Sequence, residues 1–180
     1  MPATPYDAKG LLKTAIRDEN PVVFFEDKMM YKLKGPVPEE EYTIPFGVAD
    51  IKREGEDITL VATSSMVQVA MGAAEMLEKI GVSAEVIDPR TTWPLDEKTL
   101  VESAKKTSRA MVIDEGYGRY GVTGEIASVI AEGAFYNLEA PVKRMGAMHV
   151  PIPFSPPLED MTVPTEKSVS EMALKLCGRA

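Results

Sequence analysis

The sequence predicts a three-layer α/β/α fold, in which a mostly parallel five-stranded sheet with one antiparallel strand lies between two layers of helices. Beyond residue 47, short runs of β-branched and aliphatic residues alternate with longer amphipathic segments. Such alternation is typical of βαβ units, whose crossovers are right-handed and whose parallel sheet is covered on both faces. The length of 180 residues is enough for one domain of this class and an appendage.

The first part of the chain has a different pattern. Apolar side chains at helical spacing predict a helix over residues 6–16, which the following segment DENP ends. A short apolar run predicts a strand at 22–25. Three prolines and an acidic run then interrupt every period, which predicts an extended linker. The sequence therefore divides into a helix and strand at residues 1–26, a linker at 27–47 and an α/β domain at 48–180.

The α/β domain contains the expected sheet. We expect its strands at residues 48–52, 58–63, 84–87, 110–114 and 142–145. We expect its helices at about 66–80, 95–106, 122–137 and 165–176. Residues 54–57 resemble a hairpin turn, which predicts that the first two strands pair antiparallel. Ser65 and Thr165 are N-cap candidates, and Gly81 suits a helix end.

Charge and composition exclude several functions. The chain has 20 Lys and Arg against 28 Asp and Glu, a formal charge of −8 that repels polyanions, so nucleic acid is not an expected partner. No secretory leader and no stretch of about 20 apolar residues is found, so we expect no membrane contact. A single cysteine cannot form an internal disulfide. The cytoplasm is the expected compartment.

A literal GxGxxG motif is formed by Gly116, Gly118 and Gly121, between a predicted strand and a predicted helix. Backbone amides and the helix dipole could hold a pyrophosphate there, so a free-standing dinucleotide-binding module is an alternative function. Asp114 and Glu115 come directly before the glycines and would repel a diphosphate. A turn that lets helix and strand pack closely is therefore the favoured interpretation.

Other reactive residues form no catalytic set in the sequence. His149 is the only histidine, so a metal cluster or a Ser-His-Asp triad would depend on this one imidazole. Cys177 has no predictable base beside it, and the acidic run at 39–41 is typical of a solvated linker. We expect no catalytic, cofactor-binding or metal-binding residue in this chain.

Four segments in order resemble beta subunits of thiamin-diphosphate-dependent 2-oxoacid dehydrogenases. They are PEEEYTIP at 38–45, DPRTTWPLD at 88–96, DEG at 114–116 with GVTGEIA at 121–127, and VPIPFSPPLED at 150–160. The segment YDAKG at 6–10 is most similar to acetoin or pyruvate dehydrogenase beta subunits. The resemblance covers nearly the whole chain and implies a fold like the C-terminal domain of transketolase.

The resemblance also implies what this chain lacks. Residues 1–26 are similar to the end of the preceding domain, which faces the pyrimidine of the cofactor and carries the catalytic histidine. His149 does not match that histidine. In the family, the alpha subunit supplies the site for thiamin diphosphate and magnesium, and the full assembly contains two alpha and two beta chains. The isolated chain is therefore expected to bind no cofactor alone and to have no activity.

The expected partners also come from the resemblance. They are the alpha subunit, a second beta subunit and the binding module of the lipoyl acyltransferase. The module's docking residues in the family correspond here to Glu139 and to the carboxylate of Ala180. Because apolar faces normally covered by the absent domain would be exposed, we expect the isolated chain to form a homo-oligomer.

Overall fold

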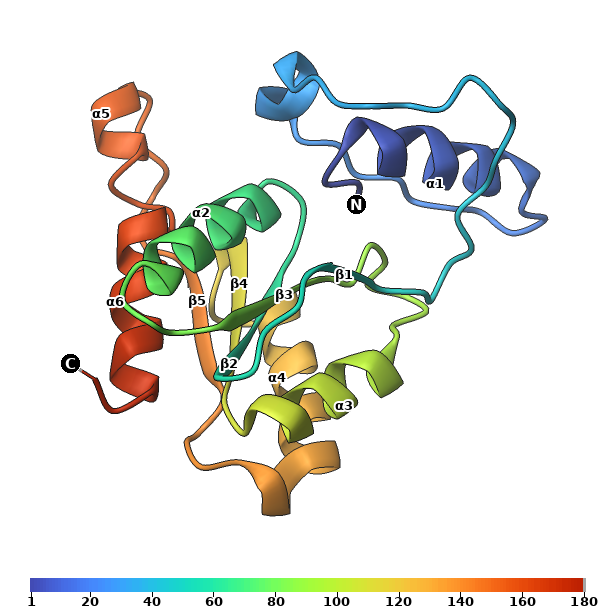
Figure 1. The fold of residues 1–180 in the computed structure, drawn as a ribbon. Helices are drawn as coiled ribbons and strands as arrows, with labels where there is room; N and C mark the ends of the chain where they lie inside the picture. The colour runs from blue at the N-terminus through green and yellow to red at the C-terminus, as the bar shows by residue number, and fades with distance from the viewer. Residues whose placement is uncertain (180) are drawn as a thin grey trace.

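A mixed sheet lies at the centre of the computed structural model, which describes residues 1–179 (Figure 1). Its strands are β1 (Asp50–Arg53), β2 (Ile58–Ala62), β3 (Ala84–Asp88), β4 (Ala110–Tyr117) and β5 (Lys143–Ala147). Their order across the sheet is β1-β3-β2-β4-β5. β1 pairs antiparallel with β3, and the other neighbours pair parallel. The predicted fold class is confirmed.

The predicted hairpin between the first two strands is wrong. Ile51 of β1 lies opposite Ile87 of β3, so the antiparallel partner is β3. The connection after β1 crosses the start of β3, where the amides of Glu56 and Asp57 both donate to the Ser83 carbonyl. All five residues of β2 are buried, which favours a central position with strands on both sides.

Helices cover both faces of the sheet (Figure 1). One layer is α2 (Met66–Glu78) with α6 (Glu166–Leu176), and the other is α3 (Glu97–Thr107) with α4 (Val122–Ala134). Alternate strand residues point to opposite layers: Leu60 packs in the core on the α2 side, whereas Val61 packs in the core on the α3 side. The strands are apolar on both faces because both faces are covered.

The predicted helix ends hold in two of three cases. Thr165 caps α6, and its hydroxyl accepts from the Ser168 amide at 3.2 Å. Gly81 has a φ of +74° just after α2, which suits glycine at a helix end. Ser65 makes no capping hydrogen bond, because its hydroxyl donates to Glu115 at 2.7 Å. The predicted helix at 122–137 is α4 followed by a short 3-10 helix, η2 (Phe135–Asn137).

The N-terminal part lies over the edge of the sheet as helix α1 (Pro5–Arg17) and the 3-10 helix η1 (Lys28–Lys32) (Figure 1). The predicted strand at 22–25 does not form. These residues instead line a cavity with Phe46 and Trp93, and a short apolar run needs a neighbouring strand edge to become a strand. A last short helix, α5 (Pro156–Glu159), precedes α6. No helix among the described residues is long and apolar enough to cross a membrane.

Candidate functional site

A buried ionic cluster joins α1 to the carboxyl end of β3. Arg90 Nε donates to Asp7 Oδ1 at 2.8 Å, and Arg90 Nη2 donates to Asp50 Oδ2 at 2.9 Å. Lys52 Nζ lies 2.9 Å from Asp7 Oδ2 and 2.6 Å from Asp50 Oδ2. Asp88 is the fifth member, with one carboxylate oxygen 3.7 Å from Lys52 Nζ. We call these five residues the ionic cluster.

The charges of the ionic cluster depend on one another. Burial alone would raise the pKa of Asp7, but hydrogen bonds from Lys52 and Thr4 outweigh it and hold that pKa below its usual value. Burial likewise opposes the charge of Lys52, yet the hydrogen bonds that it donates to Asp50 and Asp7 raise its pKa. Both ends of the contact therefore stay ionised at neutral pH, and α1 is held by charged hydrogen bonds.

The remaining residues of the 88–96 loop fasten the linker to the domain. Thr91 Oγ1 accepts from the Gly47 amide at 3.0 Å and donates to the Pro94 carbonyl at 2.6 Å. The carboxylate of Asp96 accepts from the Ala49 amide at 3.0 Å and caps α3 at the Thr99 amide at 3.1 Å. This polar loop therefore positions the end of the linker and the start of α3.

The second recognisable segment runs from the end of β4 into the loop before α4. Asp114 accepts a hydrogen bond from Thr63 at 2.6 Å, and the Gly116 amide also donates to the Asp114 carboxylate, at 3.3 Å. A β-carbon added at Gly121 would lie 2.3 Å from the Tyr117 carbonyl oxygen. The amide of the first glycine is engaged and the third glycine is in close backbone contact, so these two glycines have the packing roles that the favoured interpretation expects.

One side of the same motif packs against β5, whereas a β-carbon at Gly118 would meet open space. Arg144 of β5 donates to the Gly118 carbonyl at 2.9 Å. A β-carbon at Gly146 would lie 2.6 Å from the Gly116 carbonyl oxygen and 2.8 Å from the Gly118 amide nitrogen. Because β5 approaches so closely, a dinucleotide-binding role for Gly116, Gly118 and Gly121 has little geometric support.

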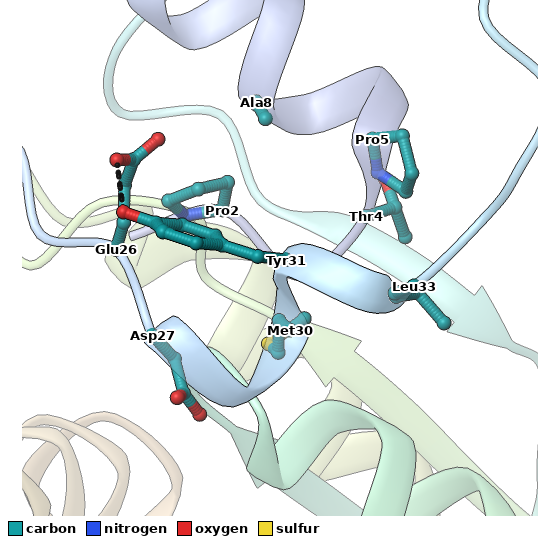
Figure 2. A pocket seen from close by; sticks show the side chains of 9 residues that line it. All are labelled: Pro2, Thr4, Pro5, Ala8, Glu26, Asp27, Met30, Tyr31 and Leu33. Carbon is teal, nitrogen blue, oxygen red and sulfur yellow. Dashed lines mark hydrogen bonds between the residues drawn. The ribbon is translucent and has the colours of Figure 1, made fainter.

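Two hollows lie beside the N-terminal part. The smaller, of about 200 Å³, is shown in Figure 2, where Tyr31 donates a hydrogen bond to Glu26 at 3.1 Å. The larger, of about 510 Å³, is a groove of mixed polar and apolar lining between residues 18–25 and the loop around Trp93, whose side chain is 87% exposed. Neither hollow gathers a base, a nucleophile and an oxyanion donor of the kind that catalysis requires.

The reactive residues singled out in the sequence lie apart. His149 is exposed and meets the ring of Tyr117 edge-on, with ring centroids 5.4 Å apart. Burial raises the pKa of the Cys177 thiol, which disfavours the reactive thiolate. In the part of the chain that the structure describes, no group of three His, Cys, Asp or Glu side chains could hold a metal ion.

The predicted docking residue Glu139 lies near the carboxyl end of α6. Its side chain, which is 60% exposed, pairs with Arg109, whose Nε donates to the Leu176 carbonyl at 3.1 Å. The Glu139 amide donates to the Ser108 carbonyl, which fixes the backbone there. Ala180, the other predicted docking residue, lies outside the described residues. Arg109 was not predicted, and it connects Glu139 to the last helix.

The ionic cluster was also missed by reasoning from the sequence. Asp7 and Arg90 are 83 positions apart, and neither period nor spacing relates them. The signal that could have found them is the run of polar residues at the carboxyl end of β3, where a parallel sheet gathers functional or anchoring side chains. That Asp7 of α1 is the partner of Arg90 could not be inferred without the tertiary structure.

Comparisons with known proteins agree with this fold. The acetoin:2,6-dichlorophenolindophenol oxidoreductase beta subunit of Bacillus subtilis is 50% identical over 178 residues, which are 99% of this chain and 52% of that protein. The pyruvate dehydrogenase E1 component beta subunit of the same organism is 46% identical over 177 residues, 98% of this chain and 54% of that protein. The chain thus spans about half the length of these relatives.

A solved structure, described as a split gene transketolase in an inactive beta4 tetramer, superimposes with a TM-score of 0.64 and 30% identity, over 76% of this chain and 44% of that one. Residues 47–169 match the family described as "Transketolase, C-terminal domain", from the linker's end into α6. This chain therefore belongs to the transketolase C-terminal domain family, in the form found in beta subunits of acetoin and 2-oxoacid dehydrogenases.

Proposed function

We propose that this chain is the assembly and docking part of the beta subunit of a thiamin-diphosphate-dependent acetoin or 2-oxoacid dehydrogenase, without catalysis of its own. The observation that carries the proposal is 50% identity to an acetoin oxidoreductase beta subunit across 99% of this chain but only 52% of that relative. The alpha subunit and a second beta subunit would then be its partners. The other half of the relatives' length would supply the cofactor-facing residues, with residues 1–26 as the end of that preceding domain.

The described residues do not fit thiamin diphosphate and magnesium. At the carboxyl ends of β2 and β4, where a diphosphate would be expected, the carboxylates of Asp114 and Glu115 are already engaged by Thr63 and Ser65. Those carboxylates repel a diphosphate, and no group of three acidic or metal-binding side chains among residues 1–179 could hold the cation. Both ligands would therefore belong to other parts of the assembly.

Docking of the acyltransferase's binding module is assigned to the surface around Glu139. The contact from Arg109 to Leu176 brings this acidic side chain near the carboxyl end of α6, so one partner could contact both Glu139 and the end of that helix. A basic module would find complementary charge there, in a protein with a formal charge of −8.

Charge reversal at this surface should weaken docking. We expect Glu139→Lys to raise the dissociation constant of a peripheral binding module about tenfold at low salt, because a rim charge is least screened there. Isothermal titration calorimetry at two salt concentrations measures the effect. Glu102→Lys is the matched control, since Glu102 is exposed on α3 and its carboxylate pairs with Lys98 of the same helix. Equal affinities for Glu139→Lys and the unaltered chain would remove Glu139 from the docking site.

Self-association is a further expectation of this function. Large apolar side chains are exposed at the loop after β4 and around α5; they are Tyr120, Ile152, Phe154, Leu158 and Met161. Apolar patches of this kind are usually covered by a partner. Light scattering over a dilution series should give at least twice the chain mass of 19.6 kDa, and Phe154→Ser should lower it. A mass of one chain at every concentration would contradict the expectation.

A further inference from the structure

One carboxylate oxygen of the ionic cluster is buried without a hydrogen-bond partner, and its nearest cation, Lys52 Nζ, lies 3.7 Å away. Asp88 Oδ1 accepts from the Arg90 amide at 2.8 Å, but Oδ2 accepts no hydrogen bond and the side chain is only 1% exposed. The space that it shares with Thr63 and the loop after β3 has no volume for a water molecule. A buried, unsolvated carboxylate is costly when charged, so a proton is the partner that this oxygen can accept.

The charges around Asp88 come from every neighbouring element. α1 contributes Asp7, β1 contributes Asp50 and Lys52, and the loop after β3 contributes Arg90, which makes three carboxylates and two cationic side chains in the ionic cluster. The amino group of Met1 also lies close, donating to the Arg90 carbonyl at 2.9 Å. β2 contributes the uncharged Thr63, whose hydroxyl binds Asp114 of β4.

From this geometry we propose that the ionic cluster is a pH-sensitive latch, which holds α1 on the sheet when Asp88 is protonated and loosens it when Asp88 is ionised. An ionised Asp88 repels Asp7, which is the anchor on α1. It also competes with Asp7 for Lys52, whose Nζ lies within 4 Å of both carboxylates. Opening would uncover Asp7 and Leu11, which are buried in the closed state.

The titration of Asp88 supports the direction of the latch. Burial raises the pKa of Asp88 to about 6, and the Arg90 amide and Lys52 offset this only in part. A raised carboxyl pKa means that the closed state binds the proton more tightly than the open state does. The added stability is thus fully present below the ordinary pKa of 3.8 and is lost as the pH rises through about 6. The pKa of Asp7 is shifted the other way, so Asp7 remains ionised across this window.

Hydrogen exchange of α1, corrected for the intrinsic effect of pH, tests the latch in the complete 180-residue chain. We expect protection of α1 amides to fall about tenfold between pH 5 and 7.5, with a midpoint near 6, while α4 amides keep theirs. In Asp88→Asn, the α1 amides should be as well protected at pH 7.5 as at pH 5. Asp160→Asn, at an exposed position after α5, is the matched control and should titrate like the unaltered chain.

The outcomes separate the latch from ordinary packing. Asp7→Asn removes the anchor from the α1 side, so α1 should be weakly protected at both pH values; this variant keeps the test decisive if Asp88→Asn does not fold. A transition that persists in Asp88→Asn would assign it to the amino group of Met1, whose pKa burial lowers, and would overturn the proposal. Equal protection of α1 at pH 5 and 7.5 in the unaltered chain would overturn it as well.

Discussion

Replacing Arg90 by alanine is expected to lower the free energy of unfolding by roughly 3–5 kcal/mol, the usual cost of removing one partner from a buried ion pair. Arg90 donates to both Asp7 and Asp50, and its side chain is 11% exposed. Without it, the fully buried Asp7 keeps only Lys52 as a cationic partner, and three carboxylates face one ammonium side chain. Residue 90 has a left-handed φ of +58°, which costs alanine about as much backbone strain as arginine. The loss of stability therefore measures mainly the removal of the charged side chain.

Urea unfolding at pH 7.5, followed by circular dichroism, measures this loss. Arg17→Ala is the matched control, because Arg17 also pairs with a carboxylate, Glu41, but with both side chains more than half exposed. That exposed pair should contribute little to stability, because solvent screens it. Similar unfolding midpoints for the two variants would show that the ionic cluster adds nothing beyond a surface ion pair.

The fold class could be predicted from the sequence because it depends on local periodicity. The positions of all five strands of the sheet and of its four covering helices follow from alternating apolar segments, and Thr165 and Gly81 mark helix ends by their chemistry. The strand order could not be predicted in the same way. Residues 54–57 have the composition of a hairpin turn, but the crossing over β3 depends on backbone contacts of Gly55, whose added β-carbon would lie 2.2 Å from the Ala84 carbonyl carbon.

For the candidate sites, the position of each loop could be predicted from the sequence, but its contacts could not. The loops at 88–96 and 114–121 were found because polar residues and glycines follow apolar strands there. The residues that these loops contact within the chain could not be predicted, because the hydrogen-bond partners of Arg90 lie 83 and 40 positions away in the sequence. Ser65 shows the limit for single residues: it stands where an N-cap belongs, but Glu115 captures its hydroxyl. At Ser65 a long-range polar contact therefore overrides the local capping preference.

The purified chain, supplied with thiamin diphosphate, magnesium and an electron acceptor, is expected to show no turnover of acetoin or pyruvate. Thiamin chemistry requires groups that bind the diphosphate and that move protons at the cofactor, and such groups must lie within hydrogen-bond reach of it. In this structure His149 is exposed beside Tyr117, and one side of the GxGxxG loop packs against Gly146 and Arg144, which leaves neither placed as a cofactor site. The turnover rate of this chain is therefore expected to equal that of the uncatalysed reaction, whereas a complete enzyme would accelerate it.

A full-length relative provides the positive control for this experiment. A full-length acetoin oxidoreductase beta subunit, about twice the length of this chain, is assayed with its alpha subunit under the same conditions as the positive control. This chain should neither replace that beta subunit in the assay nor gain activity when mixed with the alpha subunit. Measurable turnover by the pure chain would refute the assembly-and-docking proposal, because the reacting groups would then have to lie within its own 180 residues.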